Sequence, residues 1–190
     1  KFSLIHFAAS EDAKQRIIKL GELEEFVHNV GCPRIDLVKE ILTSECFDLE
    51  KHLNSLGVGD NLDLSKPTIL VSQHPVTTEF EDGAAHIRNT LMAVRELGMQ
   101  TILLWPNSDA GSGEISKEIR LFREHSNFSG VRLFKNLEIE TYVRLMAQIA
   151  CLVGNSSSGI REGAYIGTPV VNIGSRQNMR ERGINVIDVD

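Results

Sequence analysis

Strand-like and helix-like patterns of apolar residues alternate along most of the chain. Apolar runs of strand length occupy residues 2–8, 26–30, 68–72, 101–105, 131–134, 150–153, 169–173 and 185–189. Apolar residues at helical spacing predict helices over 37–42, 49–56, 84–97, 114–124, 139–148 and 159–165, and a short turn near 179–182. Another helix is expected after Ser10, which can cap it. Residues 57–61 predict a turn-rich connection rather than a domain linker.

The order of these elements predicts the fold class. Repeated strand–helix–strand connections require parallel strand pairs, with helices covering both faces of the sheet. We therefore expect an α/β protein with a doubly wound parallel sheet, a Rossmann-like fold. The chain opens at Lys1 directly into a strand-like run and ends inside another, at 185–189, which predicts that both ends are cut from a longer protein.

Four polar loops follow predicted strands and are expected to meet at one edge of the sheet. They occupy residues 73–78, 106–113, 154–159 and 174–177. In doubly wound sheets, ligands bind outside the carboxyl ends of the strands, where such loops meet. One or two polar loops could arise by chance, but four together predict a ligand site.

The loop after residues 150–153 indicates the kind of ligand. It reads Gly-Asn-Ser-Ser-Ser-Gly from 154 to 159 and leads into a predicted helix start. Such a start offers unpaired backbone N–H groups, and small residues let an anion approach them, so the loop suits a phosphate group. Glu162 lies one turn further on, where its carboxylate could accept hydrogen bonds from sugar hydroxyls, so the implied ligand is a nucleotide. An ordinary capped helix start without a ligand is the alternative.

Composition narrows the class of partner. The 190 residues are 42% hydrophobic and 24% charged, which is typical of a globular protein with one domain-sized core. A net charge of −6 gives no basic field for nucleic acid or an anionic membrane, so an anion site must be local. The three cysteines follow no metal-ligand spacing, which argues against zinc and favours reduced thiols in a cytoplasmic protein. The apolar runs are too short to span a membrane, and no cofactor is expected.

Four motifs together carry a family resemblance. They are HPVTT at 74–78, PNSDAG at 106–111, GNSSSGIRE at 154–162 and GTPVVNIGSRQ at 167–177. In their order and spacing, the chain resembles the hydrolysing UDP-N-acetylglucosamine 2-epimerases from about residue 31 to its end. The resemblance implies half of a two-domain GT-B type fold, with the active site in the cleft between two Rossmann-like domains. Residues 1–30 would be the end of the N-terminal domain or an inter-domain segment, and 31–190 the C-terminal nucleotide-binding domain, truncated at its end.

The resemblance also implies roles for nucleotide-binding residues. Ser156 and Ser157 would hold the diphosphate with the adjacent backbone amides, and Glu162 would bind the ribose hydroxyls. Arg176 would contribute to the nucleotide pocket; a solvated loop arginine is the alternative. No metal ligand is implied.

Two further residues would approach the diphosphate and sugar side, namely Asn107 and His74. His74 is the candidate catalytic residue, because imidazole can donate to a leaving phosphate or relay a proton. Alternatively it satisfies a loop carbonyl. Asp109 is expected to be structural, either capping the next helix or organising Asn107. Lys117 and Arg120 lie where some relatives bind a regulatory nucleotide, but a solvated charged face is the favoured interpretation.

The implied reaction removes the C2 proton of the sugar with loss of the nucleoside diphosphate, and water then adds to the resulting glycal with inverted C2. The products would be UDP and N-acetylmannosamine, on the route to sialic acid, made by a homo-oligomer. The main acid and base would come from the other domain, so this chain alone should be inactive. The alternatives are a UDP- or GDP-linked diacetylated bacillosamine as substrate, a GT-B glycosyltransferase, or an inert nucleotide-sensing domain.

Overall fold

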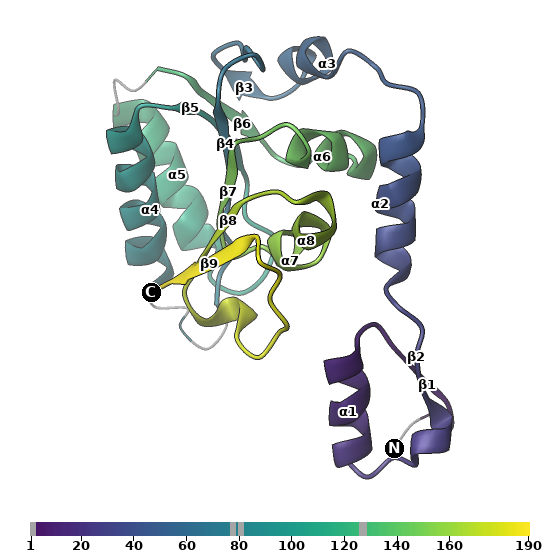
Figure 1. Cartoon of the computed structure of the whole chain (residues 1–190). Helices are drawn as coiled ribbons and strands as arrows, with labels where there is room; N and C mark the ends of the chain where they lie inside the picture. Colours follow the sequence, from purple (N-terminus) through teal and green to yellow (C-terminus); the bar gives the residue numbers. More distant parts are fainter. Residues whose placement is uncertain (1–2, 77–78, 80–81, 126–128) are drawn as a thin grey trace. The chain divides into compact units, whose positions relative to one another are not determined.

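The computed structural model describes residues 3–76, 79, 82–125 and 129–190 (Figure 1). Contacts within the chain divide it into two compact units, Lys1–Ser44 and Glu45–Asp190. The first unit is a short α/β segment. The second contains the large sheet and all the predicted site residues.

The first unit is built from two paired strands and two helices. Its elements are β1 (His6–Ala8), α1 (Glu11–Lys19), the 3-10 turn η1 (Glu24–Phe26), β2 (Val27–Asn29) and α2 (Pro33–Thr43). β1 pairs in parallel with β2. The hydroxyl of Ser10 accepts a hydrogen bond from the backbone N–H of Ala13 at 3.3 Å, which confirms the predicted cap.

The second unit contains a seven-stranded sheet in the order β3-β6-β5-β4-β7-β8-β9. Its strands are β3 (Val58–Gly59), β4 (Thr68–Ser72), β5 (Gln100–Leu104), β6 (Val131–Phe134), β7 (Cys151–Gly154), β8 (Val170–Ile173) and β9 (Val186–Val189). Its helices are α3 (Leu49–Ser55), α4 (Gly83–Leu97), α5 (Ser112–His125), α6 (Ile139–Met146), α7 (Ser157–Ile160) and α8 (Glu162–Ile166), with the 3-10 turn η3 (Ser175–Gln177). Every strand pair is parallel except β3 with β6, so the predicted doubly wound sheet is confirmed.

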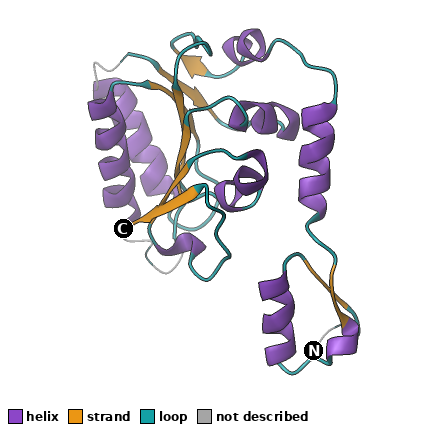
Figure 2. Cartoon of the chain, in the orientation of Figure 1, coloured by secondary structure: helices purple, strands orange, loops and turns teal. Residues whose placement is uncertain are grey.

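Apolar side chains from both faces of the sheet form the core of this unit. Because successive strand residues point to opposite faces, Leu70 packs in a cluster that includes residues of α3 and α6. Its neighbours Ile69 and Val71 pack with α4 and α5. Figure 1 shows α4 and α5 together on one side of the sheet and α6, α7 and α8 on the other; Figure 2 shows the strands between these two helical layers.

The chain reverses direction across the sheet between β4 and β7. It runs from β4 through β5 to β6 on one side, then returns to β7 beside β4 and continues to β8 and β9 on the other. The connection after β4 therefore leads to α4 on one face of the sheet, and the connection after β7 leads to α7 on the other face. Such a divergence leaves a crevice at the carboxyl ends of the strands. The predicted polar loops start at this edge.

Three predicted elements differ from the structure. Residues 57–61 are not a plain connection, because Val58 and Gly59 form β3 against β6. The helix expected over 159–165 is divided into α7 and α8 at Arg161, whose φ and ψ are −99° and −71°. The short turn expected near 179–182 begins earlier, because the 3-10 turn η3 precedes it and a turn at residues 178–179 follows η3.

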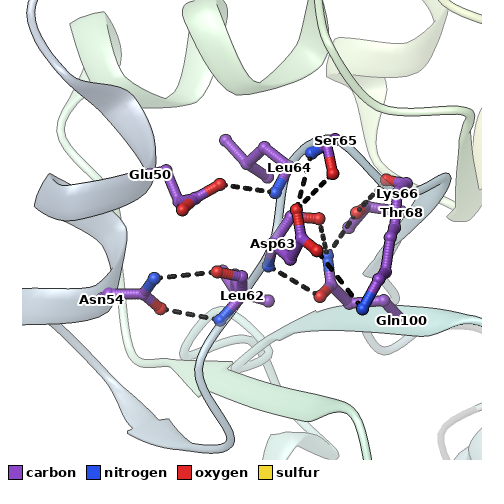
Figure 3. A network of polar contacts seen from close by, with 9 residues as sticks. All are labelled: Glu50, Asn54, Leu62, Asp63, Leu64, Ser65, Lys66, Thr68 and Gln100. Atoms are coloured by element: carbon purple, nitrogen blue, oxygen red, sulfur yellow. Dashed lines mark hydrogen bonds and ion pairs between the residues drawn. The ribbon is translucent and has the colours of Figure 1, made fainter.

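At the opposite edge of the sheet, where the strands have their amino ends, side-chain amides bind the segment that precedes β4 (Figure 3). Asn54, on α3, exchanges two hydrogen bonds with the backbone of Leu62, at 2.7 and 2.9 Å. Gln100, the first residue of β5, bonds the backbone of Asp63 and the hydroxyl of Thr68, the first residue of β4. These contacts hold the segment that leads into β4.

Candidate functional site

The end of β7 comes very close to the end of β4. Gly154 has a φ of +134°, and a Cβ built on it would lie 2.2 Å from the carbonyl oxygen of Ser72, so only glycine fits there. Asn155 follows and is 2% exposed. Its side-chain Oδ1 accepts from the backbone N–H of His74 at 2.7 Å, and its Nδ2 donates to the His74 carbonyl at 2.9 Å. The loops after β4 and β7 are thus joined.

The imidazole of His74 is held in one tautomer. The backbone N–H of Asn107 donates to its Nδ1 at 3.1 Å, so Nδ1 is the acceptor and the proton lies on Nε2. Burial and, to a smaller degree, the positive charge of Arg176 lower the pKa of His74 to about 4, while Asp109 opposes the shift. At neutral pH, His74 is therefore a neutral imidazole whose Nε2–H can donate a hydrogen bond, and the hydroxyl of Ser72 lies 3.4 Å from this nitrogen.

The loop after β5 is organised by Asp109. Its Oδ2 accepts from the Asn107 side-chain amide at 2.5 Å and lies 3.6 Å from Nη2 of Arg176. This agrees with the structural role predicted for Asp109 towards Asn107. The Oδ1 of Asn107 is buried and has no hydrogen-bond partner among the described residues. It is therefore an acceptor available to a ligand.

The serine loop places its hydroxyls in different surroundings. Ser156 is the N-cap of α7 and accepts from the backbone N–H of Ser158 at 3.4 Å. The Ser158 hydroxyl is buried and bonds the Tyr142 hydroxyl at 2.5 Å. Ser157 instead lines an open cavity. The loop thus offers Ser157 to a ligand most directly.

This cavity has a volume of about 380 Å³, within the usual range for small-molecule sites. It is lined by Pro75, Val76, Asp109, Ser157, Ser175, Arg176, Gln177 and Arg180. Among these described residues the two guanidinium groups outnumber the one carboxylate, which favours an anion. Thr77 and Thr78, the last residues of the HPVTT motif, lie outside the described residues.

The structure brings two of the predicted site residues, Ser157 and Arg176, to the lining of this cavity. His74 lines a neighbouring cavity together with Asn155. It is linked to the first cavity through Asn107, which bonds both His74 and the lining residue Asp109. Glu162 does not line this cavity; it is 3% exposed at the start of α8, with its Oε2 3.9 Å from Nε of Arg161.

Two residues of this region were not assigned roles from the sequence. Asn155 stands inside the serine-loop motif, yet only the pairing of β4 with β7 shows which backbone its amide reaches. Arg180 lies four residues after Arg176, just past the last motif, and a second arginine at that spacing was the available signal.

Other candidate features are easily placed. Lys117 and Arg120 are exposed on α5, with the Arg120 guanidinium 5.5 Å from the ring centre of Trp105, which agrees with a solvated charged face. Within residues 3–76, 79, 82–125 and 129–190, no cluster of three or more His, Cys, Asp or Glu could hold a metal ion. In the same residues, no helix is both long and apolar enough to cross a membrane.

The fold and the cavity define a Rossmann-like α/β domain with a cationic site at the carboxyl ends of its strands. The family model for UDP-N-acetylglucosamine 2-epimerase matches residues 1–190, and the chain belongs to this family. The predicted resemblance is therefore confirmed.

Individual relatives agree with this assignment. The chain is 37% identical to the UDP-N,N'-diacetylbacillosamine 2-epimerase (hydrolyzing) of Legionella pneumophila over 190 residues, all of this chain and 48% of that protein. It is 32% identical to the GDP/UDP-N,N'-diacetylbacillosamine 2-epimerase (hydrolyzing) of Campylobacter jejuni, over 99% of this chain and 47% of that protein. The chain thus spans about half the length of the curated relatives it matches.

Solved structures support the fold. The UDP-GlcNAc 2-epimerase from Neisseria meningitidis bound to UDP-GlcNAc matches with a TM-score of 0.71 and 19% identity, over 90% of this chain and 44% of that one. A glycosyltransferase from Rickettsia africae matches with a TM-score of 0.57 and 13% identity, over 98% of this chain and 49% of that one. Epimerases and glycosyltransferases share this fold, so the fold alone does not separate them.

Proposed function

We propose that this chain carries the nucleotide-binding half of a hydrolysing 2-epimerase that acts on a UDP-linked 2-acetamido sugar. The carrying observation is the cavity at the β4–β7 reversal, which gathers Ser157, Arg176 and Arg180 in a chain that belongs to the 2-epimerase family. Residues 31–190 would form the nucleotide-binding domain, with 1–30 from the other domain or the segment between domains. Cytoplasmic location and homo-oligomer formation remain predictions.

The cavity suits the leaving group of the proposed reaction. When the C1–O bond breaks, the nucleoside diphosphate gains negative charge, and cations already fixed in place stabilise that charge without reorganising. Arg176 is partly fixed, because its Nη1 donates to the Asn155 carbonyl at 3.2 Å. We assign the diphosphate to Ser157, Arg176 and the amides of the serine loop, with Ser156 shaping that loop as its cap.

His74 and Asn107 would serve the sugar side of the diphosphate. The neutral His74 can donate a hydrogen bond from its Nε2–H to a leaving oxygen, and Asn107 Oδ1 can accept a hydrogen bond from a hydroxyl or amide. We retain Glu162 as the proposed ribose ligand on the strength of its motif. Because Glu162 is buried and does not line the cavity, its contact with a ribose would need a rearrangement near the start of α8.

Two sugars are candidates for the substrate. UDP-N-acetylglucosamine is the default substrate, whereas the two relatives above are named for N,N'-diacetylbacillosamine carried on UDP or GDP. Those names favour the diacetylated sugar as the second candidate. Product analysis by NMR on both UDP sugars and on the GDP-linked sugar would decide between them. Release of free UDP and an epimerised sugar without an added acceptor would exclude a glycosyltransferase.

Exchange of the C2 hydrogen of the sugar for deuterium tests which half of the protein carries the base that removes this proton. In heavy water, a polypeptide of the relatives' full length that contains these residues should incorporate deuterium at C2 of its substrate. The 190-residue chain alone should bind nucleotide weakly and incorporate none, because positioning between two domains would be lost. Exchange by the short chain near the rate of the long one would show that the base lies within these residues, with His74 the first candidate.

A further inference from the structure

Asn155 extends the hydrogen bonding between β4 and β7 beyond the end of the strands. The register pairs Ser72 with Gly154, and the backbone N–H of Asn155 still donates to the Ser72 carbonyl at 3.1 Å. After that point the two main chains separate. The side-chain amide of Asn155 then replaces a backbone partner, since it both accepts from and donates to the main chain of His74.

The backbone carbonyl of Asn155 accepts hydrogen bonds from two side chains of the loop after β8. Nη1 of Arg176 donates to the Asn155 carbonyl at 3.2 Å, and Nε2 of Gln177 donates to it at 2.8 Å. Gln177 is 1% exposed, so its bond is shielded from water. Asn155 therefore contacts the segments after β4 and β8 while standing directly before Ser156 in the segment after β7.

We propose that Asn155 is a positioning residue, which holds His74 and Arg176 in fixed places relative to the serine loop. The inference rests on the proposed function for its catalytic meaning, although the positioning itself concerns only this chain. Asparagine suits the task because one planar amide carries both an acceptor and donors, so it can satisfy a backbone N–H and a backbone carbonyl together. Aspartate would keep the acceptor and lose the donor, and alanine would lose both.

Loss of the Asn155 side-chain hydrogen bonds would affect the imidazole of His74 through the His74 backbone. The Asn107 N–H can donate to His74 Nδ1 only while the His74 main chain stays where Asn155 holds it. Without that hold, the ring gains access to water, and the burial that lowers its pKa to about 4 is relieved. Arg176 would keep its acceptor, the main-chain carbonyl of residue 155, but this carbonyl would be held less firmly once the side-chain bonds to His74 are lost.

The matched control is Asn54, which makes the same pair of bonds at the opposite edge of the sheet. Its amide exchanges two hydrogen bonds with the backbone of Leu62, at 2.7 and 2.9 Å (Figure 3). Asn54→Ala therefore removes an equivalent pair of contacts away from the cavity. It should lower the melting temperature as Asn155→Ala does, without touching the site.

The experiment compares Asn155→Ala, Asn155→Asp and Asn54→Ala in the 190-residue chain. UDP affinity is measured by calorimetry, and the His74 titration by NMR of its ring signals. We expect Asn155→Ala to weaken UDP binding tenfold or more and to move the His74 midpoint from about 4 towards its ordinary value of 6.5. Asn155→Asp should weaken UDP binding at least as much as alanine, because its carboxylate adds a negative charge beside the anion site, and it should also raise the His74 midpoint. Asn54→Ala should leave both quantities unchanged.

Two results would overturn the proposal. One is an Asn155→Ala protein that loses stability like Asn54→Ala but keeps the wild-type UDP affinity and His74 midpoint. If that variant does not fold, Asn155→Asp decides, and a wild-type midpoint in it would refute the role. Absence of UDP binding by the unmodified chain would instead count against the proposed function, while the His74 titration would still test the positioning.

Discussion

Replacing Arg176 by alanine is the most direct test of the cavity as a diphosphate site. The guanidinium lines the cavity and is held by the Asn155 carbonyl at 3.2 Å and by Asp109 at 3.6 Å. Neither contact engages all the N–H donors of the Arg176 guanidinium. A phosphate oxygen bound by the remaining N–H groups would therefore form hydrogen bonds in which both partners are charged, the strongest kind available to a side chain.

The magnitude follows from two opposing contributions. A hydrogen bond to a charged group contributes about 1.5 to 3 kcal/mol, which corresponds to roughly a ten- to a hundredfold change in affinity. The ion pair with Asp109 is partly exposed, with side chains 24% and 44% accessible, and such pairs contribute about 1 kcal/mol or less. Competition from Asp109 thus reduces the effect of Arg176 without cancelling it. We expect Arg176→Ala to weaken UDP binding by about 0.5 to 2 kcal/mol, or roughly two- to thirtyfold.

Calorimetry with UDP on the folded variant measures this effect. The matched control is Arg88→Ala, because Arg88 also pairs with a carboxylate, Glu118 at 2.8 Å, but on the outer helices α4 and α5. That variant should bind UDP like the unmodified chain. Equal dissociation constants for Arg176→Ala and the unmodified chain would remove Arg176 from the site. Equal losses in the two variants would show that only the overall charge matters.

Three further predictions concern neighbouring groups. Glu162→Gln should weaken UDP binding and leave pyrophosphate binding unchanged, as parallel titrations would show; equal losses would limit Glu162 to supporting the loop. Arg180→Gln should weaken UDP binding more than UMP binding, because its exposed guanidinium lines the same cavity; equal losses for both nucleotides would contradict a diphosphate contact. The pKa of His74 is lowered to about 4 in the folded chain, so between pH 4 and 6.5 the unfolded chain binds more protons than the folded chain. The contribution of His74 to the free energy of unfolding is therefore complete above pH 6.5, and up to about 3 kcal/mol of it is lost as the pH falls to 4. Urea unfolding across this range should show a smaller slope for His74→Gln, and an unchanged slope would refute the shift.

The strands of the central sheet could be predicted because their sequence pattern is local. β4 is buried at all five positions, and its apolar run has the bounds that the sequence indicates. β3 has two residues, between Gly57 and Asp60, and no periodicity can reveal so short a strand. It depends on Arg132, 6% exposed, whose guanidinium donates to the carbonyls of Asn54 and Gly59 at 2.8 and 2.9 Å. Such contacts across more than seventy residues are invisible in a sequence window.

The helix after the serine loop shows a different limit. Gly159 and Gly163 were compatible with one continuous helix, but their lack of a side chain serves close packing. A Cβ on Gly159 would lie 2.9 Å from Val170 Cγ1, and one on Gly163 would lie 3.3 Å from Met146 Cε. The backbone turns at Arg161 between these two approaches, and Glu162, which is buried, starts a second helix. Tertiary packing thus overrode the local helical pattern and moved Glu162 away from the cavity lining.

The site itself was predictable in its composition and not in its connections. Polar loops after parallel strands must share an edge, which is why Ser157 and Arg176 could be placed together from the sequence. The order of the strands decides which loops touch, and β4 lies beside β7 only because the chain reverses there. The bonds from Asn155 to His74 and from Asn107 to His74 follow from that neighbourhood.

These connections in turn limit the chemistry that this half could perform. His74 holds its proton on Nε2 and has Nδ1 occupied by the Asn107 N–H, so it can donate a hydrogen bond but has no free nitrogen with which to remove a proton from C2. Asp109 is the one carboxylate among the described residues that line the cavity, and its Oδ2 is held by Asn107 and lies near Arg176. These contacts engage the carboxylate with Asn107 and Arg176 within the chain. In the proposed epimerase, this chain would therefore serve departure of the diphosphate, and removal of the C2 proton would fall to groups outside it.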